Sequence, residues 1–194
     1  NPEQVINFYN ERRKQLLDVV PNAGHLGVAD LERDFNVTVV TQNVDNLHER
    51  AGSTHVIHLH GELTKVCSSR DPYNPHFVKE LAPEEYEVKL GDKAGDGTQL
   101  RPFIVWFGES VPEIETAIRY VEQADIFVII GTSLNVYPAA GLLNYVPRAA
   151  EVYLIDPKPV DTHVMRPIHV IQKGASEGVK ELKALLTVTQ PPLP

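Results

Sequence analysis

The spacing of apolar residues changes along the chain from helical to strand-like. Residues 2–18 and about 22–34 carry apolar side chains three or four positions apart, which predicts two helices. In the second helix, the side chains expected to face the core are Leu26, Ala29 and Leu31. In Val37-Thr38-Val39-Val40-Thr41 every residue is β-branched and the apolar run is nearly continuous, which is typical of a strand buried on both faces of a parallel sheet.

Short apolar strands then alternate with helices. The predicted strands cover 37–41, 56–59, 103–106, 126–130, 151–155 and 168–171. The predicted helices between the later strands cover 112–123, 138–149 and 175–186. Parallel strands joined through helices need right-handed crossovers. The alternation therefore predicts an α/β fold with a Rossmann-like, doubly wound parallel sheet.

Residues 62–100 break this rhythm, because prolines, glycines and charged side chains cluster there. The segment predicts a small helical or loop-rich module beside the sheet. We expect a single domain over residues 1–194. Its expected parts are the helical part of the small module (1–20), the Rossmann-like core (36–61 and 101–186), the small insertion (62–100) and a proline-rich disordered tail (187–194).

Composition and charge narrow the class of protein. The formal net charge is −8, and nucleic-acid binding needs a basic face, so we expect no nucleic-acid partner. No apolar run is long enough to span a bilayer, and the first residues lack the features of a signal peptide. We therefore expect a cytoplasmic protein without a membrane partner, and a monomer by default.

The cysteine count limits disulfide and metal chemistry. The one cysteine, Cys67, excludes a disulfide within the chain and a four-cysteine zinc site. We expect no metal site. The chain has eight histidines, so a site built from histidines alone is the alternative.

The residues after the first two strands are candidates for chemistry, because open α/β sheets bind ligands beyond the C-terminal strand ends. Gln42, Asn43 and Asp45 follow the first strand, and their amide and carboxylate groups can hold a polar ligand. The alternative is a turn in which Asp45 or Asn46 caps the next helix. His60 follows the second strand and is a candidate general base, since histidine titrates near neutral pH. A loop histidine with an ordinary hydrogen bond is the alternative.

Two later strand ends carry weaker signals. Gly131, Thr132 and Ser133 follow one strand, and a glycine followed by hydroxyls can cradle a phosphate or a ribose. Asp156 follows the next strand and can accept hydrogen bonds from ribose hydroxyls. The alternative for Asp156 is a turn residue before Pro157.

The segment around Trp106 has another character. Val105, Trp106, Phe107 and Gly108 end a strand with two bulky aromatic residues and a glycine. An exposed strand of this kind can pair with an extended peptide. The alternative is that Trp106 and Phe107 pack in the core.

Four stretches of the chain together resemble one known family. They are Thr41-Gln42-Asn43-Val44-Asp45-Asn46-Leu47-His48, His58-Leu59-His60-Gly61-Glu62-Leu63, Arg101-Pro102 through Val105-Trp106-Phe107-Gly108-Glu109, and Gly131-Thr132-Ser133-Leu134-Asn135-Val136-Tyr137-Pro138-Ala139. In their order along the chain and in their residues they are similar to the signature motifs of the sirtuin family. The resemblance runs from about residue 2 to residue 186.

The resemblance implies an NAD-dependent deacylase that acts on acylated lysines of proteins or peptides and releases nicotinamide and an O-acyl-ADP-ribose. His60 matches the catalytic histidine, the general base for a ribose hydroxyl of NAD, and Asn43 matches a second catalytic residue. The expected cofactor contacts are Gln42, Asn43, Asp45, Gly131, Thr132, Ser133, Asp156 and Ala175. The expected peptide contacts are Val105, Phe107, Gly108, Glu109 and Tyr137.

The first predicted helix adds a hypothesis about the acyl group. Tyr9 and Arg12 resemble the Y-x-x-R motif of sirtuins that remove malonyl and succinyl groups. Side chains three residues apart share a helix face, and a guanidinium with a phenol can bind an acyl carboxylate. We therefore expect a preference for succinyl or malonyl over acetyl groups. An exposed basic helix face is the alternative.

The chain departs from the family pattern in two places. Many sirtuins carry four zinc cysteines where this chain has residues 62–100 and only Cys67. We therefore expect a module without zinc, held by the packing of Tyr73, Phe77, Leu81 and Tyr86. The family's opening strand, its G-A-G-I-S-x-x-S-G-I motif around the pyrophosphate and its F-R loop are not found, so we expect an N-terminally incomplete domain that binds NAD poorly.

Two other functions stay open at this point. A catalytically idle module that binds acyl-lysine peptides is favoured by the lack of the phosphate-binding motif. A protein ADP-ribosyltransferase is the second alternative.

Overall fold

The computed structural model describes residues 1–132, 139–159 and 166–189, and its chain divides into two compact units. The first unit contains Asn1–Val20, Val40–Asn46 and His58–Pro112. The second unit contains Pro21–Val39, Leu47–Ile57 and the chain from Glu113 onward. The single domain over residues 1–194 and its expected parts stay a prediction.

The second unit is built on a parallel sheet. β6 (Ile126–Ile130), β7 (Glu151–Ile155) and β8 (His169–Ile171) pair in the order β6-β7-β8, and both pairings are parallel. The strands predicted at 126–130 and 151–155 are confirmed at those bounds. Each is a short apolar run that is covered on both faces, which explains why the sequence showed it clearly.

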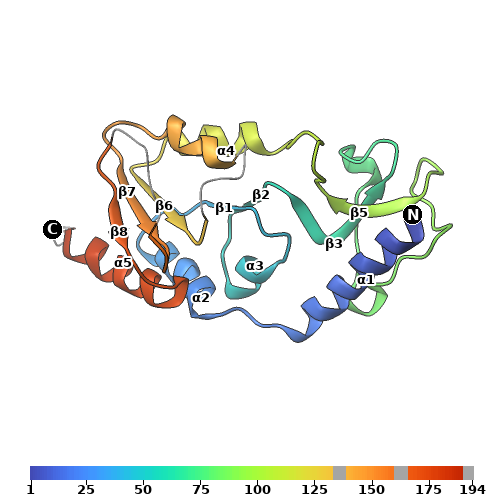
Figure 1. Ribbon diagram of the computed structural model, residues 1–194, viewed down its shortest axis with the longest axis horizontal. Helices are drawn as coiled ribbons and strands as arrows, with labels where there is room; N and C mark the ends of the chain where they lie inside the picture. Colours follow the sequence, from blue (N-terminus) through green and yellow to red (C-terminus); the bar gives the residue numbers. More distant parts are fainter. Residues whose placement is uncertain (133–138, 160–165, 190–194) are drawn as a thin grey trace. The chain divides into compact units, whose positions relative to one another are not determined.

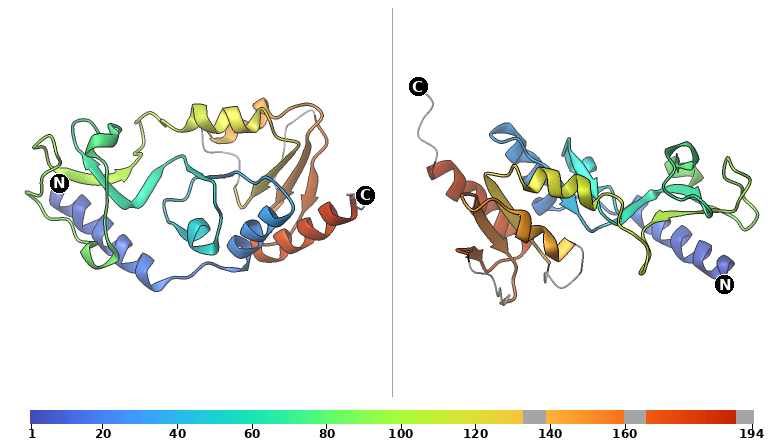
Figure 2. Two further views of the ribbon diagram at one scale, coloured as in Figure 1. Left: turned by 180° about the vertical axis from the view of Figure 1, so that it is seen from behind. Right: turned by 90° about the horizontal axis from the view of Figure 1, so that it is seen from above.

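Helices lie on both faces of this sheet (Figures 1 and 2). α2 (Ala23–Asp30), η1 (Leu31–Arg33) and α5 (Ala175–Thr189) cover one face, and α4 (Ile114–Val121) with η4 (Ala139–Tyr145) covers the other. Tyr153 and Ile155 of β7 pack with Val179 and Leu182 of α5 in one buried cluster. Because side chains alternate along a strand, the buried Val152 and Leu154 point to the opposite face. The predicted α/β layering is confirmed.

Two predicted helices differ from the observed ones. Leu26 was expected in the core, but its side chain is 52% exposed, because α2 turns Gly24, Gly27 and Val28 toward α5 instead. A Cβ at Gly27 would lie 2.7 Å from Val179, so α2 and α5 approach through small residues. The helix predicted at 138–149 is a 3₁₀ helix, η4, over Ala139–Tyr145, and Pro147 follows it closely.

The first unit contains an antiparallel sheet that the sequence did not reveal. β3 (Gly61–Ser68) lies between β4 (Lys79–Glu80) and β5 (Leu100–Ile104). The prediction of a loop-rich segment over 62–100 is therefore wrong for β3. The pairing with β5 shifts register between Gly61 and Val66, so apolar and polar residues do not alternate along the strand. The short 3₁₀ helices η2 (Pro75–Phe77) and η3 (Pro83–Glu85) follow.

α1 (Pro2–Asp18) packs against this sheet. Its bounds match the helix predicted over 2–18. Ile6 of α1 is buried with Val66 and Val88, and the partly buried Leu81 and Leu100 pack against them. Leu81 therefore contributes to the packing of the small module, as expected. The three aromatic residues expected there, Tyr73, Phe77 and Tyr86, are half-buried.

β1 (Val39–Thr41) and β2 (Val56–His58) form a separate two-stranded sheet, with α3 (Leu47–Ala51) between them in the sequence. Val39 N–H donates to His55 O, and Leu59 N–H donates to Thr41 O, both over 2.9 Å. The bonds advance in the same direction along both strands, as in a parallel pair. None of the described helices is long and apolar enough to cross a membrane.

Candidate functional site

The turn after β1 lies beside the end of β2. The N–H of Leu59 donates to the carbonyl oxygen of Thr41 over 2.9 Å. The Thr41 hydroxyl accepts a hydrogen bond from Asn43 N–H over 3.0 Å, which closes a tight turn at the strand end. Gln42 and Asn43 are thereby placed next to the strand end that carries His60.

His60 is half-buried, and the main chain orients its ring. Its Nδ1 atom lies 3.1 Å from the carbonyl oxygen of Gln42. A carbonyl oxygen can only accept, so the hydrogen belongs on Nδ1 and the neutral ring keeps its lone pair on Nε2. His58 makes the corresponding contact from Nδ1 to Asn43 O at 3.3 Å. The two predicted amide residues thus hold the histidines through their main chains, and Nε2 of His60 is left as a base.

Gly61 allows the strand end at His60 to approach β5 closely. Its φ of 84° lies in the left-handed region, and a Cβ there would meet Phe103 O at 2.1 Å. Val105 N–H donates to His60 O over 2.9 Å. The segment after β5, which the sequence predicts to meet a peptide, therefore starts beside the candidate base.

An ion pair folds this segment back on its own strand. Arg101 is only 8% exposed, and its Nη1 and Nη2 donate to Glu109 Oε1 and Oε2 over 2.7 and 3.1 Å. Glu109 Oε2 also accepts the N–H of Trp106 over 2.8 Å. The hydrogen bond from Arg101, with the one from Trp106 N–H, lowers the pKa of the Glu109 carboxyl below its ordinary value. The Glu109 side chain thus fixes the shape of the turn.

The tip of this turn is exposed. The Phe107 side chain is fully exposed, so core packing of Phe107 is wrong. Gly108 has a φ of 89° and continues the tip. Trp106 is half-buried instead, with the guanidinium carbon of Arg101 3.6 Å from its ring centroid. The ion pair explains the difference, because it bends the chain immediately after Trp106.

Tyr9 reaches this segment from α1. Nε1 of Trp106 donates to the Tyr9 hydroxyl over 2.9 Å. An indole N–H can only donate, so the Tyr9 oxygen accepts and its own hydrogen remains for another acceptor. Arg12 is exposed, and its guanidinium carbon lies 5.3 Å from the ring centroid of Phe8. The structure therefore brings Tyr9 and Arg12 together with the aromatic residues Phe8 and Trp106.

The other predicted residues that the structure describes belong to the second unit. Gly131 follows β6 and Asp156 follows β7, and these neighbouring parallel strands end at one edge of the sheet. Gly131 N–H donates to Ile155 O over 2.9 Å. Gly131 has a φ of 61°, and none of the described residues places an atom within 4 Å of the position of a Cβ there. Asp156 Oδ1 accepts from Lys158 N–H over 2.8 Å, which is the turn role named as its alternative.

Four further predicted residues add little to the description of the site. Thr132 is half-buried beyond β6, and the half-buried Ala175 begins α5. Ser133 and Tyr137 lie outside the described residues.

The sequence did not single out two residues of this arrangement. Arg101 belongs to one of the motifs, which assigns it no role, although a basic residue between apolar residues with an acid eight positions later is a signal for an ion pair. Phe8 stands directly before Tyr9 of the Y-x-x-R motif, and the motif assigns it no role. An aromatic residue one turn before Arg12 was the signal that it contacts the guanidinium.

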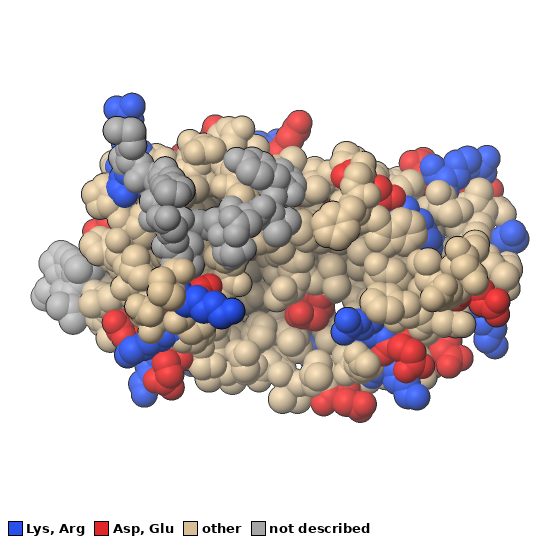
Figure 3. All heavy atoms as spheres, in the orientation of Figure 1, with Lys and Arg blue, Asp and Glu red and all other residues tan. Residues whose placement is uncertain are grey.

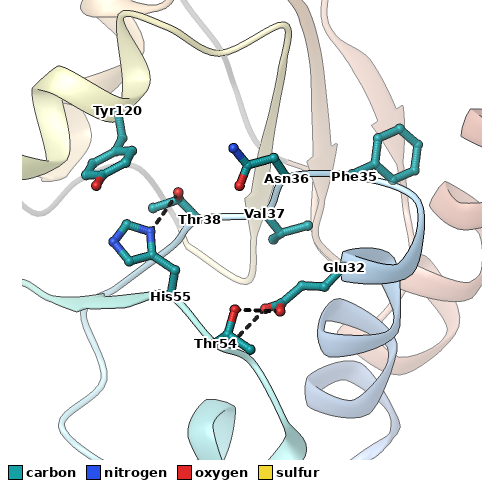
Figure 4. Close-up of a pocket in the computed structure, with 8 residues that line it drawn as sticks. All are labelled: Glu32, Phe35, Asn36, Val37, Thr38, Thr54, His55 and Tyr120. Carbon is teal, nitrogen blue, oxygen red and sulfur yellow. Dashed lines mark hydrogen bonds between the residues drawn. The ribbon is translucent and has the colours of Figure 1, made fainter.

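A separate pocket of about 380 Å³ lies wholly in the second unit (Figure 4). Its lining residues are Glu32, Phe35, Asn36, Val37, Thr38, Thr54, His55 and Tyr120. Thr38 and His55 are hydrogen-bonded over 2.9 Å, and both Glu32 oxygens accept bonds from Thr54 over 2.8 Å. Thr38 and His55 precede β1 and β2, so the pocket is at the strand starts, whereas Gln42 and His60 follow the strand ends. None of the predicted site residues lines it.

Comparisons with known sequences agree with the motif analysis. A sequence model of the Sir2 family matches residues 1–138. A protein of Bacteroides thetaiotaomicron named NAD-dependent protein deacylase is 82% identical over 186 residues, which is 96% of this chain and 80% of that protein. A Helicobacter pylori protein of the same name is 47% identical over 182 residues, covering 94% of this chain and 77% of its own.

Solved structures give the same result for the fold. A Sir2 homologue in complex with NAD is 36% identical with a TM-score of 0.80, over 97% of this chain and 73% of that one. A Sir2 complex with a p53 peptide and NAD⁺ is 27% identical with a TM-score of 0.71, over 90% of this chain and 74% of that one. From the matched family model, the high identity to these relatives and the shared fold, this chain belongs to the Sir2 family.

Proposed function

We propose that this chain is an NAD-dependent protein deacylase that removes acyl groups from lysine side chains. The names of its relatives and the peptide complex of a neighbour in fold support this reaction. The observation that carries the proposal is the His60 ring, which Gln42 O holds so that Nε2 is the free base. The substrates are proteins or peptides with acylated lysines.

The chain offers features that suit NAD in each unit. In the first unit, the buried Asn46 Oδ1 has no hydrogen-bond partner among the described residues, and an N–H of a ligand would satisfy it. In the second unit, Gly131 lies at the edge where β6 and β7 end, and no described side chain covers the position of its missing Cβ. Gln42, Asn43 and Asp45 are proposed to hold the cofactor in the first unit. Gly131, Thr132, Ser133, Asp156 and Ala175 are proposed to hold it in the second.

The residues have distinct proposed roles in the reaction. NAD would supply the ribose carbon that takes the acyl oxygen and the hydroxyl that later takes the acyl group. His60 would accept the proton of that hydroxyl at Nε2, while Gln42 O keeps the Nδ1 hydrogen in place. The exposed Asn43 side chain would orient the reacting groups, since its amide both donates and accepts.

We also propose that the acyl group is acidic. Tyr9 accepts from Trp106 and keeps its hydroxyl hydrogen for a carboxylate, and the exposed Arg12 can add a two-point charged bond. On the face seen in Figure 3, acidic and basic side chains are interspersed without a broad basic area. Arg12 would supply the positive charge for a carboxylate, and a neutral acetyl group gains nothing from it.

The small module is proposed to work without zinc. Ser68 Oγ donates to Asp96 Oδ2 over 2.7 Å and accepts from Arg70 N–H over 3.0 Å, which ties the end of β3 to the loop before β5. Burial raises the pKa of the Cys67 thiol to about 11, and the thiol donates to Pro102 O over 3.7 Å within the module.

The proposed function is tested by intact-mass analysis of a succinyl-lysine peptide and its acetyl twin, each incubated with the chain and NAD. We expect loss of the succinyl group with formation of succinyl-ADP-ribose, and slower loss of the acetyl group. His60→Asn should abolish both reactions and leave the peptides bound. Transfer of ADP-ribose to protein would show the other chemistry, and no product from either peptide would contradict the deacylase proposal.

A further inference from the structure

A row of stacked side chains leads from a buried ion pair to the exposed Arg12. Arg101, which pairs with Glu109, lies 3.6 Å from the Trp106 centroid. The rings of Trp106 and Tyr9 are 6.5 Å apart and joined by the Nε1–hydroxyl hydrogen bond. Tyr9 then meets Phe8 edge-on at 5.1 Å, and Arg12 lies over Phe8 at 5.3 Å. Every member of the row belongs to the first unit.

Phe8 has no evident role in the core. Its side chain is 53% exposed, and it does not belong to the buried cluster around Ile6, Val66 and Val88 of its own unit. Its ring contacts are with Tyr9 and Arg12, the two residues proposed to bind the acyl carboxylate. The contacts with Tyr9 and Arg12 therefore account for an aromatic ring at this exposed position.

Arg12 needs such a support. The ion pairs found among the described residues do not include Arg12. A long exposed side chain without a fixed partner occupies many rotamers, and ordering them on binding lowers affinity. A guanidinium above an aromatic face is attracted to it, and positions i and i+4 of a helix meet on the surface. Phe8 restricts Arg12 while leaving its N–H groups open to a ligand.

We propose that Phe8 is a positioning residue that holds Arg12 beside Tyr9 and so sets the preference for acidic acyl groups. The inference rests on the proposed function, since it names a residue that tunes acyl recognition in the same site. Cation–π attraction at an exposed site corresponds to about two- to fivefold in affinity, so removing the ring should weaken binding of an acidic acyl group by about that factor.

The test uses Trp106 as a reporter of binding. It is the one tryptophan of the chain and is hydrogen-bonded to Tyr9, so its fluorescence reports a ligand at Tyr9 without turnover or NAD. Phe8→Leu removes the ring and keeps an apolar side chain, whereas Phe8→Tyr keeps the ring. Each variant is titrated with a succinyl-lysine peptide and its acetyl twin.

We expect Phe8→Leu to weaken succinyl binding about two- to fivefold and leave acetyl binding unchanged, with Phe8→Tyr close to the unaltered chain. Equal weakening of both peptides, no weakening, or equal losses in Phe8→Leu and Phe8→Tyr would overturn the role of Phe8. Failure of the proposed function has another signature. In that case succinyl binding responds to Phe8 as expected, but neither peptide is deacylated when NAD is added.

Discussion

Two neighbouring arginines on α1 occupy opposite environments. Arg12 is exposed and lies over Phe8, whereas Arg13 is 3% exposed. Arg13 Nε donates to Tyr86 O over 2.7 Å, and Nη2 donates to Asn10 Oδ1 over 2.9 Å. Burial lowers the pKa of Arg13 to about 10, which still leaves it charged at neutral pH. Arg13 thus serves the fold, and Arg12 is available to a ligand.

Replacing Arg13 should cost stability, whereas replacing Arg12 should not. Arg13→Met leaves Tyr86 O without its side-chain donor and removes one of the two donors to Asn10 Oδ1, which keeps the Val88 N–H, so we expect a loss of about 2–4 kcal/mol in the free energy of unfolding. Arg12→Met is the matched control and should unfold at the same urea concentration as the unaltered chain. Equal midpoints for both variants would show that the buried hydrogen bonds do not stabilise α1.

Asp96 is a second residue whose charge serves the fold. Its carboxylate accepts hydrogen bonds from the hydroxyls of Thr98 and Ser68, both over 2.7 Å. These bonds favour the charged form and lower the pKa of Asp96 from its ordinary value of 3.8. Arg70 adds an ion pair at 3.5 Å.

This network predicts a pH dependence of stability. The folded pKa of Asp96 is below the unfolded value, so its contribution is complete above the unfolded pKa and is lost as the pH falls through the folded pKa. We expect the urea midpoint to decline below about pH 5. In Asp96→Asn the midpoint should be lower at pH 7 and decline less steeply in acid. Parallel pH curves for the two chains would contradict this role.

At the scale of elements, glycines set how closely helices approach the sheet of the second unit. Gly178 is buried in α5, and a Cβ there would lie 2.2 Å from Cγ2 of Ile155 in β7. Gly27 of α2 meets Val179 of α5 in the same way, at 2.7 Å. The absence of a side chain, rather than backbone freedom, is what these positions require.

Gly178→Ala should therefore destabilise the chain despite the better helix propensity of alanine. Within a helix, alanine is about 1 kcal/mol more favourable than glycine. Overpacking of the added methyl group against Ile155 costs about 1–3 kcal/mol. Gly174→Ala is the control, because no atom of the described residues lies within 4 Å of its Cβ position, and it should be near neutral. The thermal unfolding midpoints of Gly178→Ala, Gly174→Ala and the unaltered chain are compared by circular dichroism. A higher midpoint for Gly178→Ala would mean that α5 shifts freely.

At the scale of the whole molecule, each unit has a buried cluster of its own. Val66 and Val88 are buried with Ile6 in the first unit, and Leu182 and Ile155 are buried with their neighbours in the second. The first unit combines its cluster with the polar network at Asp96, and both are built from the side chains of this chain alone. The stability of the small module then depends on these contacts.

A chelator should leave the thermal unfolding midpoint unchanged, because the proposed module needs no zinc. The measurement is thermal unfolding of the whole chain with and without a strong zinc chelator. Asp96→Asn serves as the positive control, since it should lower the midpoint under both conditions. A midpoint that falls with chelator in the unaltered chain would contradict the zinc-free proposal.

The sequence by itself determined the parts of this protein that depend on local pattern. α1, β6 and β7 lie at their predicted bounds, because one is a helix with apolar residues at helical spacing and the others are short runs covered on both faces. The motifs around Asn43 and His60 indicated the family, because their order and their residue identities can be recognised without knowledge of any contact in space.

Only the tertiary structure decided features that depend on residues far apart in the chain. β3 became visible through its pairing with β5, because a shift in register removes the alternation that marks a strand. Leu26 is exposed because α5 packs on the glycine face of α2. Phe107 is exposed and Trp106 is stacked because Arg101 pairs with Glu109. Each outcome depends on which distant residue packs against the segment in the folded chain, and the spacing of residues along the sequence does not specify that residue.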